Sequence, residues 1–279
     1  MSLSQKVKSP IGIFDSGYGG LTILNEMRSK MPQYDFLYLG DNARSPYGTR
    51  SFDVVYKFTL QCVEYLFSQG CELVILACNT ASAKALRTIQ QKDLPKKYPN
   101  KRVLGVIRPT VEAIGKFTKS RKIGLFATNG TVVSNSYPLE VEKLYTDIKV
   151  YSVACPMWVP LIENGEHLDK GADFFVKKYS DELMQKGKNI DTVILGCTHY
   201  PLLKDKIRSV LPQMNILSQG SIVAGSLIDY LKRHTEIDDN CSKNGITEYL
   251  TTENVDKFSS SATVFLSENI VARKIELNS

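Results

Sequence analysis

The chain has 279 residues, of which 43% are hydrophobic and 23% charged, and its formal net charge is +6. These values are ordinary for a soluble globular protein with one large domain or two smaller ones. Residues 1–10 lack the apolar stretch of a signal peptide. The longest uncharged apolar run, residues 150–162, contains two prolines and is shorter than the roughly 20 residues of a membrane span. We therefore expect a cytoplasmic protein without a membrane partner.

Short apolar runs rich in β-formers alternate with helical patterns along the chain, which predicts an α/β fold with parallel sheets. Runs such as LVILA are typical of strands that helices cover on both faces. In chain order, the candidate strands are residues 12–14, 36–39, 73–77, 103–107, 123–126, 150–153, 192–195 and 216–217.

Apolar residues recur at helical spacing in three segments, 21–31, 52–67 and 222–231. Pro32 ends the first and Gly70 follows the second, as expected at helix termini. The basic segment KDLPKKYPNKR (92–102) lies between predicted elements, and no recognised nucleic-acid-binding module accompanies it. We interpret this segment as a solvated connector and expect no nucleic-acid partner.

Two segments occur twice. VILACNT (74–80) returns as VILGCTH (193–199), and IGIFDS (11–16) returns as IGLFAT (123–128). The repetition predicts two pseudo-symmetric α/β domains with the active site in the cleft between them. The predicted first domain comprises residues 1–105 plus 215–279, the last part packing back as an extra helix and a terminal segment. The predicted second domain comprises residues 106–214.

Cysteines stand at positions 62, 71, 78, 155, 197 and 241, and no C-x-x-C pair is present. Cys197 and His199 have the spacing of half a metal site, but no second pair accompanies them, so we predict no metal site. Most of these thiols should be reduced, and several simply buried.

Cys78 and Cys197 each fall between a predicted strand and the start of a helix, where the helix dipole favours a thiolate. A lone cysteine at such a place is more often a small core residue. Two cysteines at equivalent points of a repeat favour a catalytic pair. His199 is placed to polarise the Cys197 thiol, and Asp15 is the matching group in the other half, as a helix N-cap, a functional carboxylate or both.

The glycine-rich turn GYGG (17–20) precedes a helix. Thr22 occupies the third glycine position of a dinucleotide fingerprint, and the chain has no G-K-[ST] sequence, which excludes a P-loop. Such a turn can still bind an anion, for example a carboxylate, through backbone N–H groups. Glu163 by itself would be interpreted as a helix-surface carboxylate.

With these motifs the chain resembles the glutamate racemases of the aspartate/glutamate racemase superfamily over nearly its whole length. The segments that carry the resemblance are IGIFDSGYGGLT (11–22), LGDNARSPYG (39–48), ACNTASA (77–83), ATNGTVVSNSYP (127–138), CPMWVPLIE (155–163) and LGCTHYPLL (195–203).

The resemblance implies interconversion of L- and D-glutamate, with D-glutamate supplied to peptidoglycan synthesis and with no cofactor or metal. It implies that Cys78 acts on D-glutamate with help from Asp15, and that Cys197 acts on L-glutamate with help from His199, which Glu163 orients. The substrate contacts that it implies are Asp15, Ser16, Tyr47, Gly48, Asn79, Thr80, Thr128, Thr198 and His199.

Two positions depart from the expected pattern. Gln219 stands where we expect an acidic or small residue, and we assign the difference to oligomer contacts or regulation. Arg108 is an additional charge beside the connector between the domains, and the sequence gives it no function. The assembly we expect is a homodimer, although nothing in the sequence selects its face.

Two alternatives stay open at this stage. A related substrate, aspartate or a hydantoin, would also use two thiols. A non-catalytic protein could bind an acidic ligand in the same cleft, although the presence of both thiols argues against it.

Overall fold

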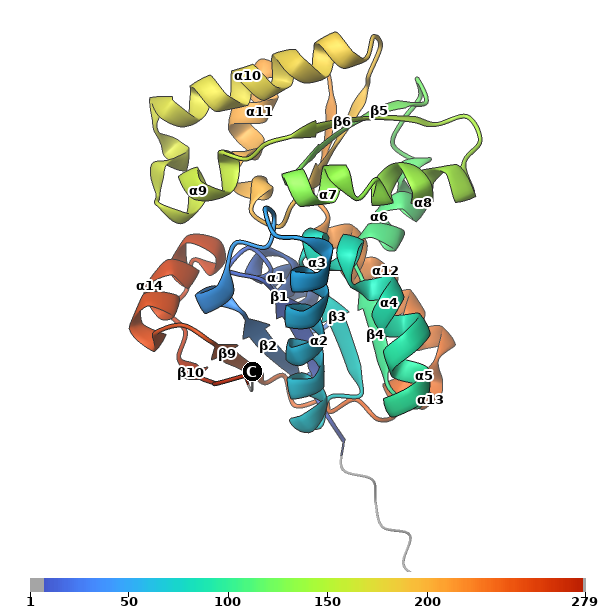
Figure 1. The fold of residues 1–279 in the computed structure, drawn as a ribbon, viewed down its shortest axis with the longest axis vertical. Helices are drawn as coiled ribbons and strands as arrows, with labels where there is room; N and C mark the ends of the chain where they lie inside the picture. Colours follow the sequence, from blue (N-terminus) through green and yellow to red (C-terminus); the bar gives the residue numbers. More distant parts are fainter. Residues whose placement is uncertain (1–7, 278–279) are drawn as a thin grey trace, which may run out of the picture.

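The computed structural model describes residues 8–277 and contains two parallel sheets, each flanked by helices (Figure 1). The sheets lie one above the other in Figure 1, and the chain passes from one to the other and back. The predicted two-domain α/β architecture is therefore confirmed. The expectation that residues 1–10 form no signal peptide concerns mainly residues 1–7, which lie outside the described residues.

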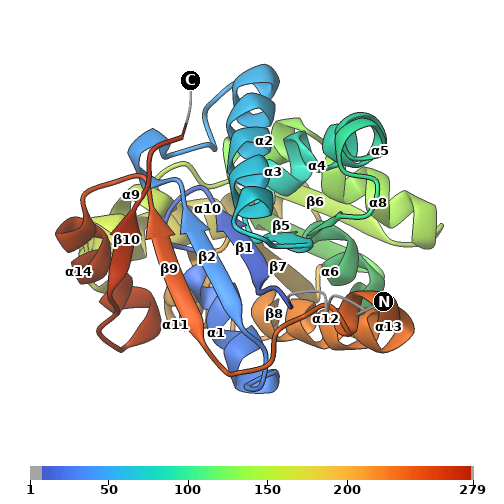
Figure 2. The same cartoon turned by 90° about the horizontal axis from the view of Figure 1, so that it is seen from below.

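The larger sheet has six strands in the order β10-β9-β2-β1-β3-β4, and every pair is parallel. Figure 2 shows four of them, β10, β9, β2 and β1, side by side. The residues of β1, β2 and β3 are all buried, which explains their continuous apolar sequences. The strands are β1 (Ile11–Asp15), β2 (Phe36–Gly40), β3 (Leu73–Leu76), β4 (Arg102–Gly105), β9 (Thr247–Thr251) and β10 (Ala272–Lys274).

The smaller sheet has four parallel strands in the order β6-β5-β7-β8. This order repeats the β2-β1-β3-β4 part of the larger sheet, so the two sequence echoes occupy equivalent strands. Cys78 follows β3 and Cys197 follows β7, each at the same point of its sheet. The strands are β5 (Lys122–Ala127), β6 (Lys149–Ala154), β7 (Thr192–Gly196) and β8 (Asn215–Leu217).

The helices divide between the two domains, each set flanking one sheet. Those of the first domain are α1 (Leu21–Lys30), α2 (Phe52–Ser68), α3 (Asn79–Lys84), α4 (Leu86–Thr88), α5 (Leu94–Lys97), α12 (Gly220–Arg233), α13 (Thr235–Asp238) and α14 (Val255–Leu266). Those of the second are α6 (Ile107–Ile114), α7 (Asn129–Val133), α8 (Ser136–Leu144), α9 (Trp158–Glu163), α10 (Lys170–Lys186) and α11 (Lys204–Val210).

Helix α2 shows how the sequence fixes these elements. The hydroxyl of Ser51 caps its N-terminus by accepting a hydrogen bond from the backbone N–H of Val54, and Gly70 takes a positive φ of 98° just after its end. Most of its predicted apolar stripe is buried, from Val55 to Phe67, with Tyr56 and Leu60 partly buried. Phe52 is 45% exposed, and the Lys84 ammonium lies 4.9 Å from its ring centroid.

The structure corrects several sequence predictions. Strand β8 pairs with β7, so residues 215–217 belong to the second sheet and not to the first domain. Strand β4 ends at Gly105, two residues before the predicted end. The basic segment 92–102 is partly helical, because it contains α5. The C-terminal segment adds two strands that the sequence analysis missed, β9 and β10, at the edge beyond β2.

None of the helices within residues 8–277 combines the length and apolar character needed to cross a bilayer. The same part of the chain contains no cluster of three or more His, Cys, Asp or Glu side chains placed to hold a metal ion. All six cysteines are buried and free, which confirms the expectation for them.

Candidate active site

Residues at the carboxyl ends of equivalent strands of the two domains meet at the domain interface. The hydroxyl of Thr198, after β7, donates to Asp15 at the end of β1 over 3.4 Å. The hydroxyls of Thr80, after β3, and Thr128, after β5, lie 2.9 Å apart. Each contact joins a residue just after one cysteine to the end of the first strand in the other domain. The strand ends of the two halves of the duplicated chain therefore meet at one place, and each half contributes a residue to both contacts.

The glycine-rich turn before α1 allows this close approach. A Cβ atom on Gly19 would lie 2.3 Å from His199 Nδ1 and 2.3 Å from Thr198 Oγ1, so no larger residue fits. The backbone N–H of Gly17 donates to the Asp15 carboxylate over 2.9 Å. The carboxylate that this turn binds is therefore that of Asp15 itself.

Cys78 is the N-cap residue of α3, and its side chain is 6% exposed. Its sulfur lies 3.3 Å from the Ser16 hydroxyl and accepts a hydrogen bond of 3.5 Å from the backbone N–H of Ala81. Burial and then the negative charge of Asp15 raise the pKa of Cys78 to about 12, more than its hydrogen bonds lower it. This group is therefore a neutral thiol at neutral pH.

Cys197 is equally buried at 6% exposure but has different partners. Its sulfur lies 3.9 Å from His199 Nδ1, and His199 Nε2 lies 2.9 Å from the Glu163 carboxylate. Burial lowers the pKa of His199, but the hydrogen bonds to Cys197 and Glu163 outweigh it and raise the pKa to about 10. His199 is therefore an imidazolium at neutral pH, and its positive charge lies next to the Cys197 sulfur.

An aromatic cluster holds this second group of residues together. Trp158, at the start of α9, packs edge-on against Tyr200 with ring centroids 4.8 Å apart and against Phe126 of β5 at 4.9 Å. The Tyr200 hydroxyl donates to the backbone carbonyl of Cys155. Because α9 ends at Glu163 and Tyr200 follows His199, this packing sets the distance between the carboxylate and the imidazole.

Asp15 is fully buried, and burial raises its pKa, although the charge of His199 opposes the shift. The N-cap residue of α1 is Gly20, which has no side chain, so Asp15 does not cap this helix as the alternative interpretation proposed. Asp15 acts on Cys78 through its charge, since the hydroxyl beside that sulfur belongs to Ser16.

The sequence pattern of the Asp/Glu/Hydantoin racemase family matches residues 22–224. A glutamate racemase from Persephonella marina is 45% identical over 215 residues, which cover 77% of this chain and 79% of that protein. The chain belongs to the Asp/Glu/Hydantoin racemase family.

Solved structures agree with this assignment. A glutamate racemase isoform from Bacillus anthracis superposes on the racemase with a TM-score of 0.88 at 36% identity, covering 96% of this chain and 98% of that one. The enzyme from Francisella tularensis, solved in complex with D-glutamate, gives a TM-score of 0.87 at 32% identity and covers 97% of this chain and 98% of that one. The resemblance stated from the motifs is thereby confirmed.

Tyr47 and Gly48 lie in the loop after β2, and in the racemase the backbone of Gly48 contacts the other domain. The Tyr47 side chain is 1% exposed, and its hydroxyl donates to the buried Asp41. The carbonyl of Gly48 accepts a hydrogen bond of 2.7 Å from the backbone N–H of Gly130 in the other domain. Any substrate contact at Tyr47 would therefore use its main chain.

Asn79 is buried, and its amide bonds to the side chains of Tyr137 and Gln219. Gln219 is only 2% exposed within the chain, so the interpretation of this position as an oligomer contact is wrong. Tyr137, which lies inside the motif of residues 127–138, was not among the predicted site residues. An aromatic residue after the polar run Ser134–Ser136, near the start of α8, was the available signal.

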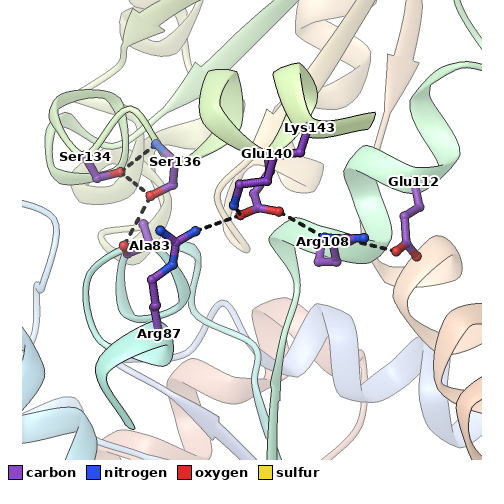
Figure 3. A network of polar contacts seen from close by, with 8 residues as sticks. All are labelled: Ala83, Arg87, Arg108, Glu112, Ser134, Ser136, Glu140 and Lys143. Atoms are coloured by element: carbon purple, nitrogen blue, oxygen red, sulfur yellow. Dashed lines mark hydrogen bonds and ion pairs between the residues drawn. The ribbon is translucent and has the colours of Figure 1, made fainter. Parts of the chain in front are cut away.

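Arg108 takes part in an exposed ion-pair network on another part of the domain interface (Figure 3). Its guanidinium lies 2.8 Å from Glu112 and 3.4 Å from Glu140 of α8. Arg87 of the first domain reaches the same Glu140 carboxylate at 3.1 Å. The charge that the sequence left unexplained thus belongs to a link between the two domains.

Proposed function

We propose that this racemase interconverts L- and D-glutamate without a cofactor, with Cys78 and Cys197 as the two acid–base groups. The observation that carries the proposal is the pair of thiols at equivalent strand ends with opposite surroundings. One lies beside Ser16 and a buried carboxylate, and the other beside the His199–Glu163 pair. The relatives that are glutamate racemases support glutamate as the substrate.

From L-glutamate, the Cys197 thiolate removes the α-proton and becomes a thiol. The Cys78 thiol then donates its proton to the opposite face of the α-carbon, which yields D-glutamate and leaves Cys78 as a thiolate. The reverse reaction begins at Cys78. A neutral Cys78 beside Asp15, with an imidazolium at His199, supports a free enzyme that is ready for the L-enantiomer.

The α-proton of an amino acid is weakly acidic, so the carbanion needs donors placed around its carboxylate. The side chains of Ser16, Asn79, Thr80, Thr198 and Thr128, with the backbone of Tyr47 and Gly48, supply these donors in our proposal. The crossing contacts between the domains support this grouping. With no cofactor to accept the electron pair, this electrostatic stabilisation is the main source of rate enhancement.

In this proposal the product D-glutamate serves peptidoglycan synthesis. The expected compartment is the cytoplasm, and the expected assembly is a homodimer. The test is a comparison of kcat/KM for glutamate, aspartate and a hydantoin with the purified chain. We expect kcat/KM to be higher for glutamate by at least about two orders of magnitude. A site that binds the side-chain carboxylate of glutamate would bind that of a substrate with a shorter or different side chain less well. A preference for aspartate or a hydantoin contradicts the assignment.

A further inference from the structure

Gln219 occupies the point where the chain returns from the second domain to the first. It follows β8 and directly precedes α12, which packs on α1 of the first domain. The other passage between the domains is at Val106, between β4 and α6. Helices α6 and α12 contact each other at the level where the domains meet (Figure 1). Gln219 thus lies beside both passages of the chain.

The amide of Gln219 is the centre of a buried hydrogen-bond network. Its Oε1 accepts a bond of 2.6 Å from Asn79 Nδ2, and its Nε2 donates to Tyr137 and Thr110 hydroxyls at 2.8 Å each. The Tyr137 hydroxyl donates in turn to Asn79 Oδ1 over 2.7 Å. Asn79 comes from the first domain, whereas Tyr137 and Thr110 lie on α8 and α6 of the second.

This network leaves only one orientation for the Asn79 amide. Because the Tyr137 hydroxyl donates to Oδ1, the nitrogen must face Gln219, and one of its two N–H groups is used there. A carboxylate at position 219 could not donate to Tyr137 and Thr110, and a small residue would not reach Asn79. The glutamine therefore has both the length and the donor–acceptor pattern that this network needs.

We infer that Gln219 is a positioning residue of the active site, which fixes the Asn79 amide so that its remaining N–H donates to the substrate carboxylate. The inference rests on the proposed function, because the contact between Asn79 and the substrate is part of that proposal. It also connects the site to the arrangement of the domains. Asn79 is held by both Gln219 and Tyr137 only when α6 and α8 sit as they do here.

The test is a double-mutant cycle in glutamate racemisation. We expect Gln219→Leu to lower kcat and kcat/KM about tenfold in the wild-type background, since one hydrogen-bonded donor is misplaced in the transition state. In the Asn79→Ala background the same change should alter kcat by less than about twofold, because no amide is left to position. Tyr137→Phe should behave like Gln219→Leu and provides a second route if that variant does not fold.

Ser82→Ala is the matched control. Ser82 is buried on the same helix as Asn79, its hydroxyl donates to the backbone carbonyl of Leu76, and it contacts neither Gln219 nor the Asn79 amide through any hydrogen bond within the described residues. We expect this variant to lose thermal stability while kcat stays unchanged.

Additive losses in the cycle, or a kcat for Gln219→Leu equal to that of wild type, would overturn the inference while leaving the racemase activity intact. A wild-type chain that does not racemise glutamate would instead refute the proposed function.

Discussion

The surroundings of Cys78 and Cys197 differ, although the two thiols follow equivalent strands in two sheets that share the same order of four strands. Around Cys78 the partners are a hydroxyl, a backbone N–H and the charge of a buried carboxylate, and burial with the carboxylate charge raises the pKa of the thiol more than the two hydrogen bonds lower it. Around Cys197 the partner is an imidazole whose positive charge Glu163 stabilises. The duplication placed one thiol at the same point of each domain, and divergence of the flanking residues gave the two thiols different neighbours.

The largest effect should come from removing either thiol. We expect Cys78→Ser and Cys197→Ser each to lower kcat/KM by about 10³-fold or more in both directions, because each direction needs one group to accept a proton and the other to donate it. Circular dichroism of each purified glutamate enantiomer measures the rates. A variant that loses activity in one direction only would contradict the account.

His199→Asn removes the positive charge beside Cys197 and should lower kcat/KM by roughly 10²-fold. The loss must be equal in the two directions, because enantiomers have equal free energies and the equilibrium constant is unity. The asymmetry of the site should appear in kcat and, by the same factor, in KM, with the larger drop of both for L-glutamate, the substrate of Cys197. Initial rates over a range of both enantiomers provide this test, and equal effects on the two kcat values would remove the distinction between the thiols.

Glu163→Gln should have a smaller effect, of roughly tenfold on kcat. The change removes one of the contributions that raise the pKa of His199, so the alkaline limb of the pH–rate profile should move from near pH 10 to lower pH. An NMR titration of the His199 ring protons measures the same shift directly. An unchanged limb would show that the carboxylate does not set the charge of the imidazole.

The same pair should influence stability. The pKa of His199 is raised from 6.5 to about 10 on folding, so its contribution to the free energy of unfolding is complete below pH 6.5 and is lost as the pH rises through 10. Urea unfolding of wild type between pH 6 and 10 should therefore show a decline that is shallower in His199→Asn. Parallel profiles for the two proteins would argue against a protonated His199.

The smallest effect should follow from Arg108→Ala. Its side chain is 53% exposed, and exposed ion pairs contribute about 0.5 kcal/mol or less. We expect kcat and KM to stay at wild-type values and the free energy of unfolding to change by no more than that. A clear change in kcat would mean that the network in Figure 3 controls the domain arrangement around the thiols.

Sequence patterns predicted the strands around the thiols because these are continuous apolar runs that both sheets bury. Strands β9 and β10 were missed because TEYLT and ARK are short segments whose place depends on pairing with distant parts of the chain, β9 with β2 and β10 with β9. The repeat identified Cys78 and Cys197 by position. The hydrogen bonds of the buried Gln219 depend on contacts between elements far apart in the chain, which no local pattern encodes. The burial of the Tyr47 side chain depends on the packing of its loop, which the sequence pattern does not show either.

The division of labour between the thiols is tested most directly by α-proton exchange in deuterated water, followed by NMR for each glutamate enantiomer with wild type, Cys78→Ser and Cys197→Ser. With wild type, deuterium should appear at the α-carbon of the product enantiomer earlier than at the α-carbon of the substrate that remains. Cys78→Ser should exchange only the α-proton of L-glutamate, and Cys197→Ser only that of D-glutamate. Racemisation by either variant at the wild-type rate, or exchange of the enantiomer assigned to the missing thiol, would contradict the two-thiol account.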